Sequence, residues 1–155
     1  MAEELRTTEG SKSEKYALLY EQLHALLSNE TDSIARMATA VAAIHHTFRF
    51  WWTGFYRVAG EELVLGPFQG PIACTRIRYG RGVCGTAWQQ QRTLLVPDVS
   101  QFPGHIACSS ASQSEIVVPM VREGAVVAVL DIDSEHLATF DEVDQLWLEK
   151  ITNLL

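Results

Sequence analysis

Three cysteines, Cys74, Cys84 and Cys108, are the residues of this chain best suited to covalent chemistry. Their odd number argues against a closed disulfide framework, so redox or nucleophilic chemistry is expected. Cys108 is flanked by small and hydroxylic residues, in the segments GHIA and SSAS. Backbone N–H groups and hydroxyls of this kind can lower a thiol pKa from about 8.5 toward neutrality, which predicts a reactive thiolate at Cys108. Plain packing in the core is the alternative for each cysteine.

Two acidic residues, Asp131 and Asp133, lie two positions apart in the β-branched segment VLDIDS. Such residues project to one side of a sheet, where they can bind a cation such as an α-ammonium group. The face of Glu115, which opens the preceding apolar run, depends on the turn between the two runs. A three-residue turn places it opposite Asp133, and a two-residue turn places it on the other face. The alternative is that the strand ends here and the acids are solvated.

Aromatic residues come in a cluster at Trp51, Trp52 and Tyr56. On a strand the two adjacent tryptophans face opposite sides, and Tyr56 shares the face of Trp52. At a pocket wall an indole suits a methyl group or a sulfur atom, with a contact energy of about 0.3 to 1.5 kcal/mol. A competing reading pairs His105 with Cys108 as in a hydrolase, although no orienting group is evident. No metal is expected, because the cysteines form no Cys-x-x-Cys pair.

The elements that position these residues follow from apolar periodicity. Steps of three and four predict helices over residues 14–27, from Thr31 or Asp32 to residue 46, over 83–91, and after a cap at Thr139. The closing helix is expected to bury an apolar stripe that includes Leu146. Aromatic and β-branched runs predict strands over residues 48–58, 62–68, 75–79, 93–97, 116–122 and 126–133. Residues 98–114 are expected to be irregular.

This order of elements indicates an α+β fold in which helices gather on one face of a mostly antiparallel sheet. We expect a flexible N-terminal arm over residues 1–13 and one domain over 14–155, since 155 residues with 47% hydrophobic content suffice for one core. The net charge of -7 and the scattered basic residues exclude an electrostatic footprint for nucleic acid or anionic lipid. Without a signal peptide or a long apolar run, the expected location is cytoplasmic.

Seven motifs carry a family resemblance between about Trp51 and Phe140. They occur in the order WWTGFY, LVLGPFQG, IAC, GRGVCGTAW, DVSQFPGHIAC, SEIVVP and VLDIDS. With these motifs the chain resembles the free methionine-R-sulfoxide reductases, which are stand-alone GAF domains. The resemblance implies a GAF-like sheet with the N-terminal helices and the C-terminal helix on one face and the active-site loops on the other.

The resemblance also implies roles for individual residues. Cys108 matches the catalytic nucleophile, Cys74 the resolving cysteine, and Cys84 an auxiliary or alternative resolving cysteine. The residues that match the substrate pocket are Glu115, Asp131, Asp133, Trp52 and Tyr56. Ser109 departs from the acid expected after the nucleophile in many members, which leaves the charge around Cys108 open.

The implied reaction is the reduction of free L-methionine (R)-sulfoxide to L-methionine. Cys108 attacks the sulfoxide sulfur, and Glu115 in its acid form or nearby backbone N–H groups support the oxygen. The resulting sulfenic acid condenses with Cys74 to a disulfide. Thioredoxin, with thioredoxin reductase and NADPH, restores the thiols, and no cofactor is bound. A homodimer is compatible with this function. The alternative is a non-catalytic GAF sensor of a small molecule, which leaves the cysteines unexplained.

Overall fold

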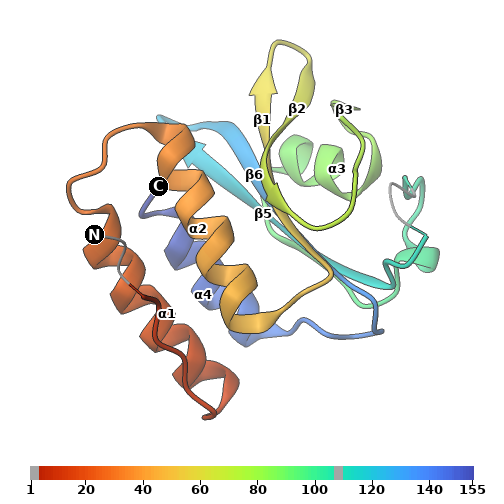
Figure 1. Ribbon diagram of the computed structural model, residues 1–155. Coiled ribbons are helices and arrows are strands. Elements are labelled where there is room, and N and C mark those ends of the chain that lie inside the picture. The colour runs from red at the N-terminus through yellow and green to blue at the C-terminus, as the bar shows by residue number, and fades with distance from the viewer. Residues whose placement is uncertain (1–3, 107–109) are drawn as a thin grey trace.

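Six strands form one antiparallel sheet at the centre of the computed structural model, which describes residues 4–106 and 110–155. The strands are β1 (Trp52–Ala59), β2 (Glu62–Gln69), β3 (Arg76–Arg78), β4 (Leu94–Val96), β5 (Ser114–Arg122) and β6 (Ala125–Ser134). Their order across the sheet is β3-β2-β1-β6-β5-β4, and every neighbouring pair is antiparallel. The sheet curls at the β1–β3 end (Figure 1). The α+β prediction is confirmed.

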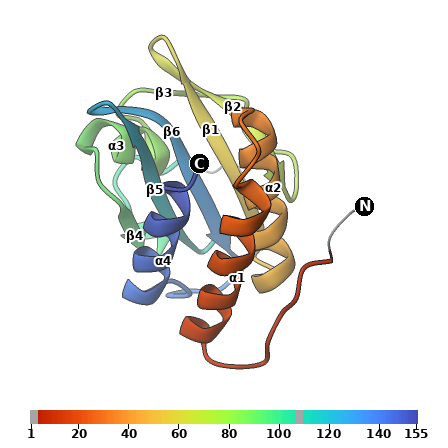
Figure 2. The same ribbon diagram turned by 90° about the vertical axis from the view of Figure 1, so that its left-hand side faces the viewer.

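Helices cover both faces of this sheet, and they divide the core in two. The helices are α1 (Lys12–Leu27), α2 (Ser33–Phe48), α3 (Gly82–Gln90) and α4 (Glu142–Thr152). α1, α2 and α4 pack together on one face, and α3 lies on the other (Figures 1 and 2). Alternate strand residues feed the two apolar clusters, such as Phe55 on the α2 side and Tyr56 on the α3 side. Within the described residues, no helix has the length and apolar character needed to span a membrane.

The N-terminal helices begin at side-chain caps. Asp32 caps α2, as the sequence indicates. α1 begins at Lys12, because Ser11 and Glu14 form a capping box ahead of it. The helix therefore reaches two residues into the arm expected over 1–13. In the described part of that arm, Arg6 exchanges two hydrogen bonds with Gln22 of α1.

The cap of the closing helix is Asp141, so the prediction of Thr139 is wrong. The Asp141 carboxylate accepts hydrogen bonds from the N–H groups of Val143 and Asp144, which start the helix. Thr139 instead hydrogen-bonds the Ser134 hydroxyl at 2.6 Å. Leu146, expected in the core, is 53% exposed, because α4 buries the face that carries Asp144, Leu148 and Ile151.

The β5–β6 hairpin sets which way the acidic residues face. Its turn has two residues, Glu123 and Gly124, both with positive φ (53° and 77°). A bulge at Val127 adds one unpaired residue to β6 and shifts the register by one. Glu115 consequently lies opposite Asp133. The expectation that a two-residue turn puts Glu115 on the other face is wrong. The extra residue at the bulge reverses the alternation of side chains along β6, and Glu115 therefore lies on the same face as Asp133.

Candidate functional site

One pocket on the α3 face of the sheet is lined by all five residues that the sequence singles out for substrate binding. They are Trp52 and Tyr56 of β1, Glu115 of β5, and Asp131 and Asp133 of β6. Strands β1, β6 and β5 are neighbours, and Asp133 pairs with both Trp52 and Glu115. The side chains meet because these register positions point to the same side of the pleated sheet. Helix α3 closes the pocket from the other side.

Of the three carboxylates of the pocket, Glu115 and Asp131 are buried and Asp133 is half-buried, and their hydrogen bonding is incomplete. Glu115 is 5% exposed and Asp131 is 7% exposed. Asp133 Oδ1 accepts a hydrogen bond of 2.8 Å from the Ser112 hydroxyl, whereas Asp131 Oδ1 has no hydrogen-bond partner. In residues 4–106 and 110–155, no lysine or arginine forms an ion pair with any of the three. A buried carboxylate without a cation indicates a site that a ligand completes.

Burial and mutual repulsion set the protonation of this cluster. Burial, followed by the charges of Asp131 and Asp133, raises the pKa of Glu115 well above its usual value. Burial and then Asp133 raise the pKa of Asp131 as well. Burial raises the pKa of Asp133 to about 6, against the opposing hydrogen bonds from Ser112 and Glu115. These shifts favour a proton on Glu115 and on Asp131, and they leave Asp133, with a pKa of about 6, as the carboxyl group of the cluster that ionises most readily.

Cys84 lies in the first turn of α3, inside the acidic cluster. Its thiol is free and buried, and the ligand atoms of Cys84, Glu115 and Asp131 lie within 4.8 Å of one another. Burial first, and then the charges of Asp131 and Glu115, raise the pKa of the Cys84 thiol. The three groups form a donor set for a cation, either a metal ion or an ammonium group. The three residues come from β5, β6 and α3, so they form no short sequence motif that would indicate the site.

Of the two other cysteines, the structure describes only Cys74, which follows the pocket residue Ala73. Cys74 is half-buried in the loop between β2 and β3, and it is disulfide-bonded. Cys108 and Ser109 lie outside the described residues, so their contacts remain predictions. The disulfide makes Cys74 a candidate for redox chemistry.

The aromatic residues tie the Cys74 loop to the sheet. Trp52 Nε1 donates a 3.1 Å hydrogen bond to the carbonyl of Pro71, and the Tyr56 hydroxyl donates one of 2.9 Å to the carbonyl of Cys74. The two rings stack at 5.8 Å. Gly54 makes room for the indole, since a Cβ there would come within 2.5 Å of the Trp52 ring. Trp51, just before β1, also packs on this side, contrary to the prediction that the adjacent tryptophans face opposite sides.

Three further residues line the pocket that sequence reasoning did not assign to it. Ser112 lies in the hydroxyl-rich stretch after Cys108, which was the available signal. Arg81 is the N-cap residue of α3, although its side chain makes no capping hydrogen bond. Its position in the sequence gives no sign that it lines a pocket. His105 also reaches the pocket, and burial lowers its pKa. Its proposed pairing with Cys108 falls partly outside the described residues.

The chain has close relatives of known name. A family model for the GAF domain matches residues 28–155. GAF domain-containing protein A of Dictyostelium discoideum is 58% identical over 156 residues, covering 100% of this chain and 99% of the relative. Free methionine-R-sulfoxide reductase of Escherichia coli (strain K12) is 44% identical over 142 residues, covering 91% and 86%.

A solved structure matches the whole architecture. The X-ray structure of free methionine-R-sulfoxide reductase from Neisseria meningitidis, in complex with its substrate, superposes with a TM-score of 0.95 at 47% identity. The match covers 97% of this chain and 92% of that chain. The fold thus has a counterpart that was solved with its substrate.

Proposed function

We propose, because this chain belongs to the GAF-domain family and within it to the free methionine-R-sulfoxide reductases, that it reduces free L-methionine (R)-sulfoxide to L-methionine. The observation that carries the proposal is a buried three-carboxylate pocket beneath two stacked aromatic rings, next to a disulfide-bonded cysteine. A zwitterionic amino acid with a sulfoxide side chain suits each part of this pocket. The relative from Neisseria meningitidis, solved with its substrate, supports the same choice.

The acidic cluster recognises the free amino acid. Asp133, ionised near neutral pH, and the unpartnered Oδ1 of Asp131 bind the α-ammonium group. Trp52 and Tyr56 contact the methyl and sulfur end of the substrate. A methionine sulfoxide within a peptide has no α-ammonium group, and it would leave these buried carboxylates unpaired. Preference for the free amino acid follows from that penalty.

The proposed chemistry starts at Cys108. Its thiolate attacks the sulfoxide sulfur while Glu115, held in its acid form, gives a proton to the oxygen. Methionine leaves with its sulfur reduced, and the oxygen stays on Cys108 as a sulfenic acid. The Cys74 thiol then displaces this oxygen as water and forms a Cys74–Cys108 disulfide. The observed disulfide at Cys74 supports this step. A thioredoxin-like dithiol returns both thiols, and the proposal needs no bound cofactor or metal.

Cys84 has a secondary place in this scheme. Attack on a sulfenic acid needs a thiolate, and burial among carboxylates keeps the Cys84 thiol protonated. Cys74 therefore resolves first. Cys84 serves as the alternative resolving cysteine only where Cys74 is missing, and otherwise contributes its thiol to the cation-binding cluster.

Single-cysteine variants test the proposal. Cys108→Ser abolishes the release of methionine from free methionine (R)-sulfoxide with dithiothreitol as reductant. With thioredoxin as reductant, Cys74→Ser releases about one methionine per protein molecule in a rapid burst, and later turnover is much slower because the buried Cys84 thiol resolves poorly. Equal multi-turnover activity in both variants would reject these roles. Binding of the sulfoxide by the wild-type protein without any release of methionine would indicate the non-catalytic sensor instead.

A further inference from the structure

The charge of this chain is unevenly distributed along the sequence. The whole chain has 19 acidic and 12 basic residues, yet residues 63–97 contain no aspartate or glutamate. The same stretch contains four arginines, at positions 76, 78, 81 and 92. It also contains Cys74 and its disulfide. In a protein of net charge -7, the stretch that carries Cys74 thus has only basic charges of its own, and Glu61 and Glu62 lie just before it on the chain.

Three residues next to Cys74 project outward and define what we call the Cys74 rim: Ile72, Arg76 and Arg78. Hydrogen bonds from Trp52 and Tyr56 hold the carbonyls of Pro71 and Cys74, and they leave Ile72 93% exposed. Arg76 and Arg78 are exposed on the edge strand β3, with buried Ile77 between them.

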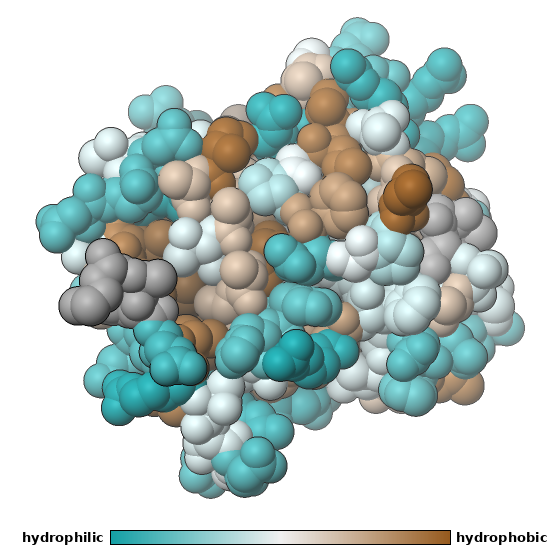
Figure 3. Space-filling view, in the orientation of Figure 1, coloured by the Kyte–Doolittle hydropathy of each residue, from teal (hydrophilic) through white to brown (hydrophobic). Residues whose placement is uncertain are grey.

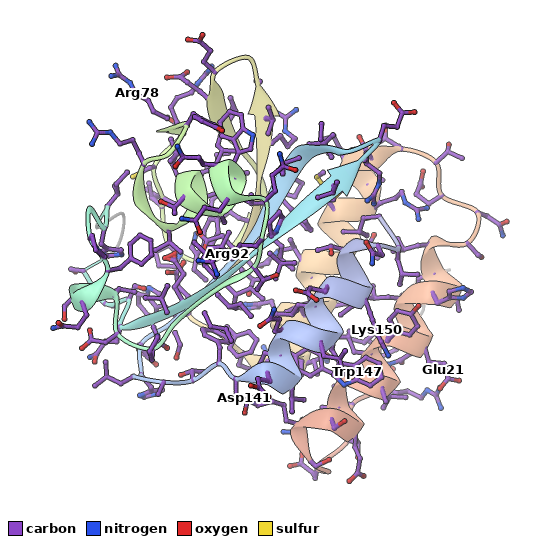
Figure 4. The ribbon with its side chains drawn as sticks, turned by 180° about the vertical axis from the view of Figure 1, so that it is seen from behind. Glu21, Arg78, Arg92, Asp141, Trp147 and Lys150 are labelled. Atoms are coloured by element: carbon purple, nitrogen blue, oxygen red, sulfur yellow. The ribbon has the colours of Figure 1, made fainter. Side chains whose placement is uncertain are left out.

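The figures show the same arrangement. Arg78 points away from the molecule at the curled end of the sheet (Figure 4). Hydrophobic side chains reach the surface over this end among hydrophilic ones (Figure 3). Arg76 pairs with Glu62 at 3.3 Å, but both side chains are well exposed, so the pair is screened and easily exchanged. An apolar side chain flanked by exposed arginines is a surface to which an acidic protein can dock.

We propose that the Cys74 rim is the docking surface for the protein that reduces the enzyme, a small acidic dithiol protein of the thioredoxin class. The inference rests on the proposed function, in which a disulfide at Cys74 must be reduced after each turnover. Ile72 contacts the apolar surface around the partner's dithiol, and Arg76 and Arg78 attract its carboxylates.

The exchange that follows docking is balanced. A thiolate of the partner attacks Sγ of Cys74 and forms a mixed disulfide, while the other cysteine of the enzyme leaves as a thiolate and takes up a proton. The partner's second thiol loses its proton and attacks the partner's own sulfur in the mixed disulfide. Cys74 then leaves as a thiolate and takes up a proton, and the partner keeps an intramolecular disulfide. Two electrons pass from the partner to the enzyme.

The test compares reduction of the oxidised protein by thioredoxin and by dithiothreitol, without any sulfoxide. The second-order rate constant of each reductant is measured by stopped-flow tryptophan fluorescence for the wild-type protein, the double variant Arg76→Gln/Arg78→Gln and the control Arg92→Gln. Arg92 belongs to the same acid-free stretch but lies between α3 and β4, away from the Cys74 rim. The double variant is expected to lose roughly fivefold with thioredoxin and nothing with dithiothreitol.

Ionic strength and Ile72 supply the second readout. Added salt should lower the thioredoxin rate constant of the wild-type protein and bring it close to that of the double variant. Ile72→Asp should lower the ratio of the thioredoxin rate constant to the dithiothreitol rate constant. Equal thioredoxin rate constants in the wild-type protein and the double variant, or an equal loss in Arg92→Gln, would overturn the proposal. A lack of sulfoxide reductase activity would remove only the proposed function, because these rate constants need no sulfoxide.

Discussion

At the scale of single residues, the site is governed by carboxylates that the fold crowds together. Glu115, Asp131 and Asp133 lie together on neighbouring strands, and the Ser112 hydroxyl donates a hydrogen bond to Asp133. Burial raises all three pKa values, and repulsion within the cluster adds to the rise for Glu115 and Asp131. The same crowding costs folding free energy, because ionised groups are held out of water.

Replacing Glu115 tests the proton-donor role. Glu115→Gln keeps the size and polarity of the side chain but removes the acidic proton, so kcat should fall by roughly 10²- to 10⁴-fold. KM should change much less, because the ammonium group is bound by the two aspartates. The activity of the wild-type protein should also fall at alkaline pH, because Glu115 loses its proton above its raised pKa. Glu115→Gln has no such proton to lose, so its residual activity should not show this alkaline fall. Steady-state kinetics across pH measure both effects, and an unchanged kcat would contradict the role.

Replacing Asp133 tests the cost of the crowding. A pKa raised to about 6 means that the folded protein disfavours the ionised form, so this group's stabilisation is present below its unfolded pKa and is lost as pH rises through about 6. Asp133→Asn should therefore raise the free energy of unfolding by about 2 kcal/mol at about pH 8, and by little at about pH 4. KM for the sulfoxide should rise in the same variant. Urea titrations at the two pH values measure this difference, with exposed Glu21→Gln on α1 as the control.

At the scale of elements, the approach of α3 to the sheet builds one wall of the pocket. A Cβ at Gly85 would lie 2.5 Å from the carbonyl oxygen of Arg78, so only glycine lets the helix pack this closely against the end of β3. The neighbouring Cys84 owes its place among the carboxylates to that contact.

Gly85→Ala should move α3 outward and lower the free energy of unfolding by about 1 to 3 kcal/mol. KM should rise, because the wall that carries Cys84 moves with the helix. Thermal unfolding and substrate kinetics measure the two effects. Thr86→Ala, one residue further along α3, removes a methyl group and a hydroxyl bonded to the Gly82 carbonyl, but adds no atom between α3 and β3, and it is the control. Gly85→Ala with wild-type KM and stability would show that the packing is less tight than the distance indicates.

The elements themselves were accessible from the sequence, since periods of two and of three to four residues report on the faces that each element buries. Asp32 as the cap of α2 and the short link between β1 and β2 were predictable for the same local reason. The bulge at Val127 was not. No local sequence pattern marks this bulge, yet the residue that it adds to β6 shifts the register and places Glu115 opposite Asp133. Thr139 and Asp141 both have cap chemistry, and only the packing of α4 selects between them.

At the scale of the whole molecule, the sheet separates a helical layer that stabilises the fold from a face that carries the site. A buried polar link joins the first and last helices within the helical layer. The Tyr16 hydroxyl donates a 2.6 Å hydrogen bond to Asp144 Oδ1, and Lys12 Nζ lies 2.7 Å from Asp144 Oδ2. The helices that carry this link, α1 and α4, lie on the opposite face of the sheet from α3 (Figure 2), and α3 lines the pocket.

Removing this link should change stability and leave catalysis unchanged. Tyr16→Phe leaves the buried Asp144 carboxylate without its tyrosine partner, so the free energy of unfolding should fall by about 1 to 3 kcal/mol. Well below the melting temperature, kcat and KM for the sulfoxide should equal those of the wild-type protein. Exposed Tyr79→Phe is a matched control. A loss of kcat in Tyr16→Phe in fully folded protein would mean that the two faces are coupled.

Much of the candidate site was predictable because strand parity already relates Asp131 to Asp133 and Trp52 to Tyr56. The contributions of Ser112, Arg81 and Ile72 were not, since they depend on loops and a helix cap whose paths follow from long-range contacts. The place of Cys84 among the acids was missed for the same reason.

The protected Cys84 thiol gives this protein an internal reference for measuring its own oxidation. Alkylating reagents modify thiolates, and a buried thiol with a raised pKa presents almost none at neutral pH. The mass added to the native protein by such a reagent thus reports the redox state of the remaining cysteines, and denaturation afterwards releases one additional reactive sulfur as a built-in calibration.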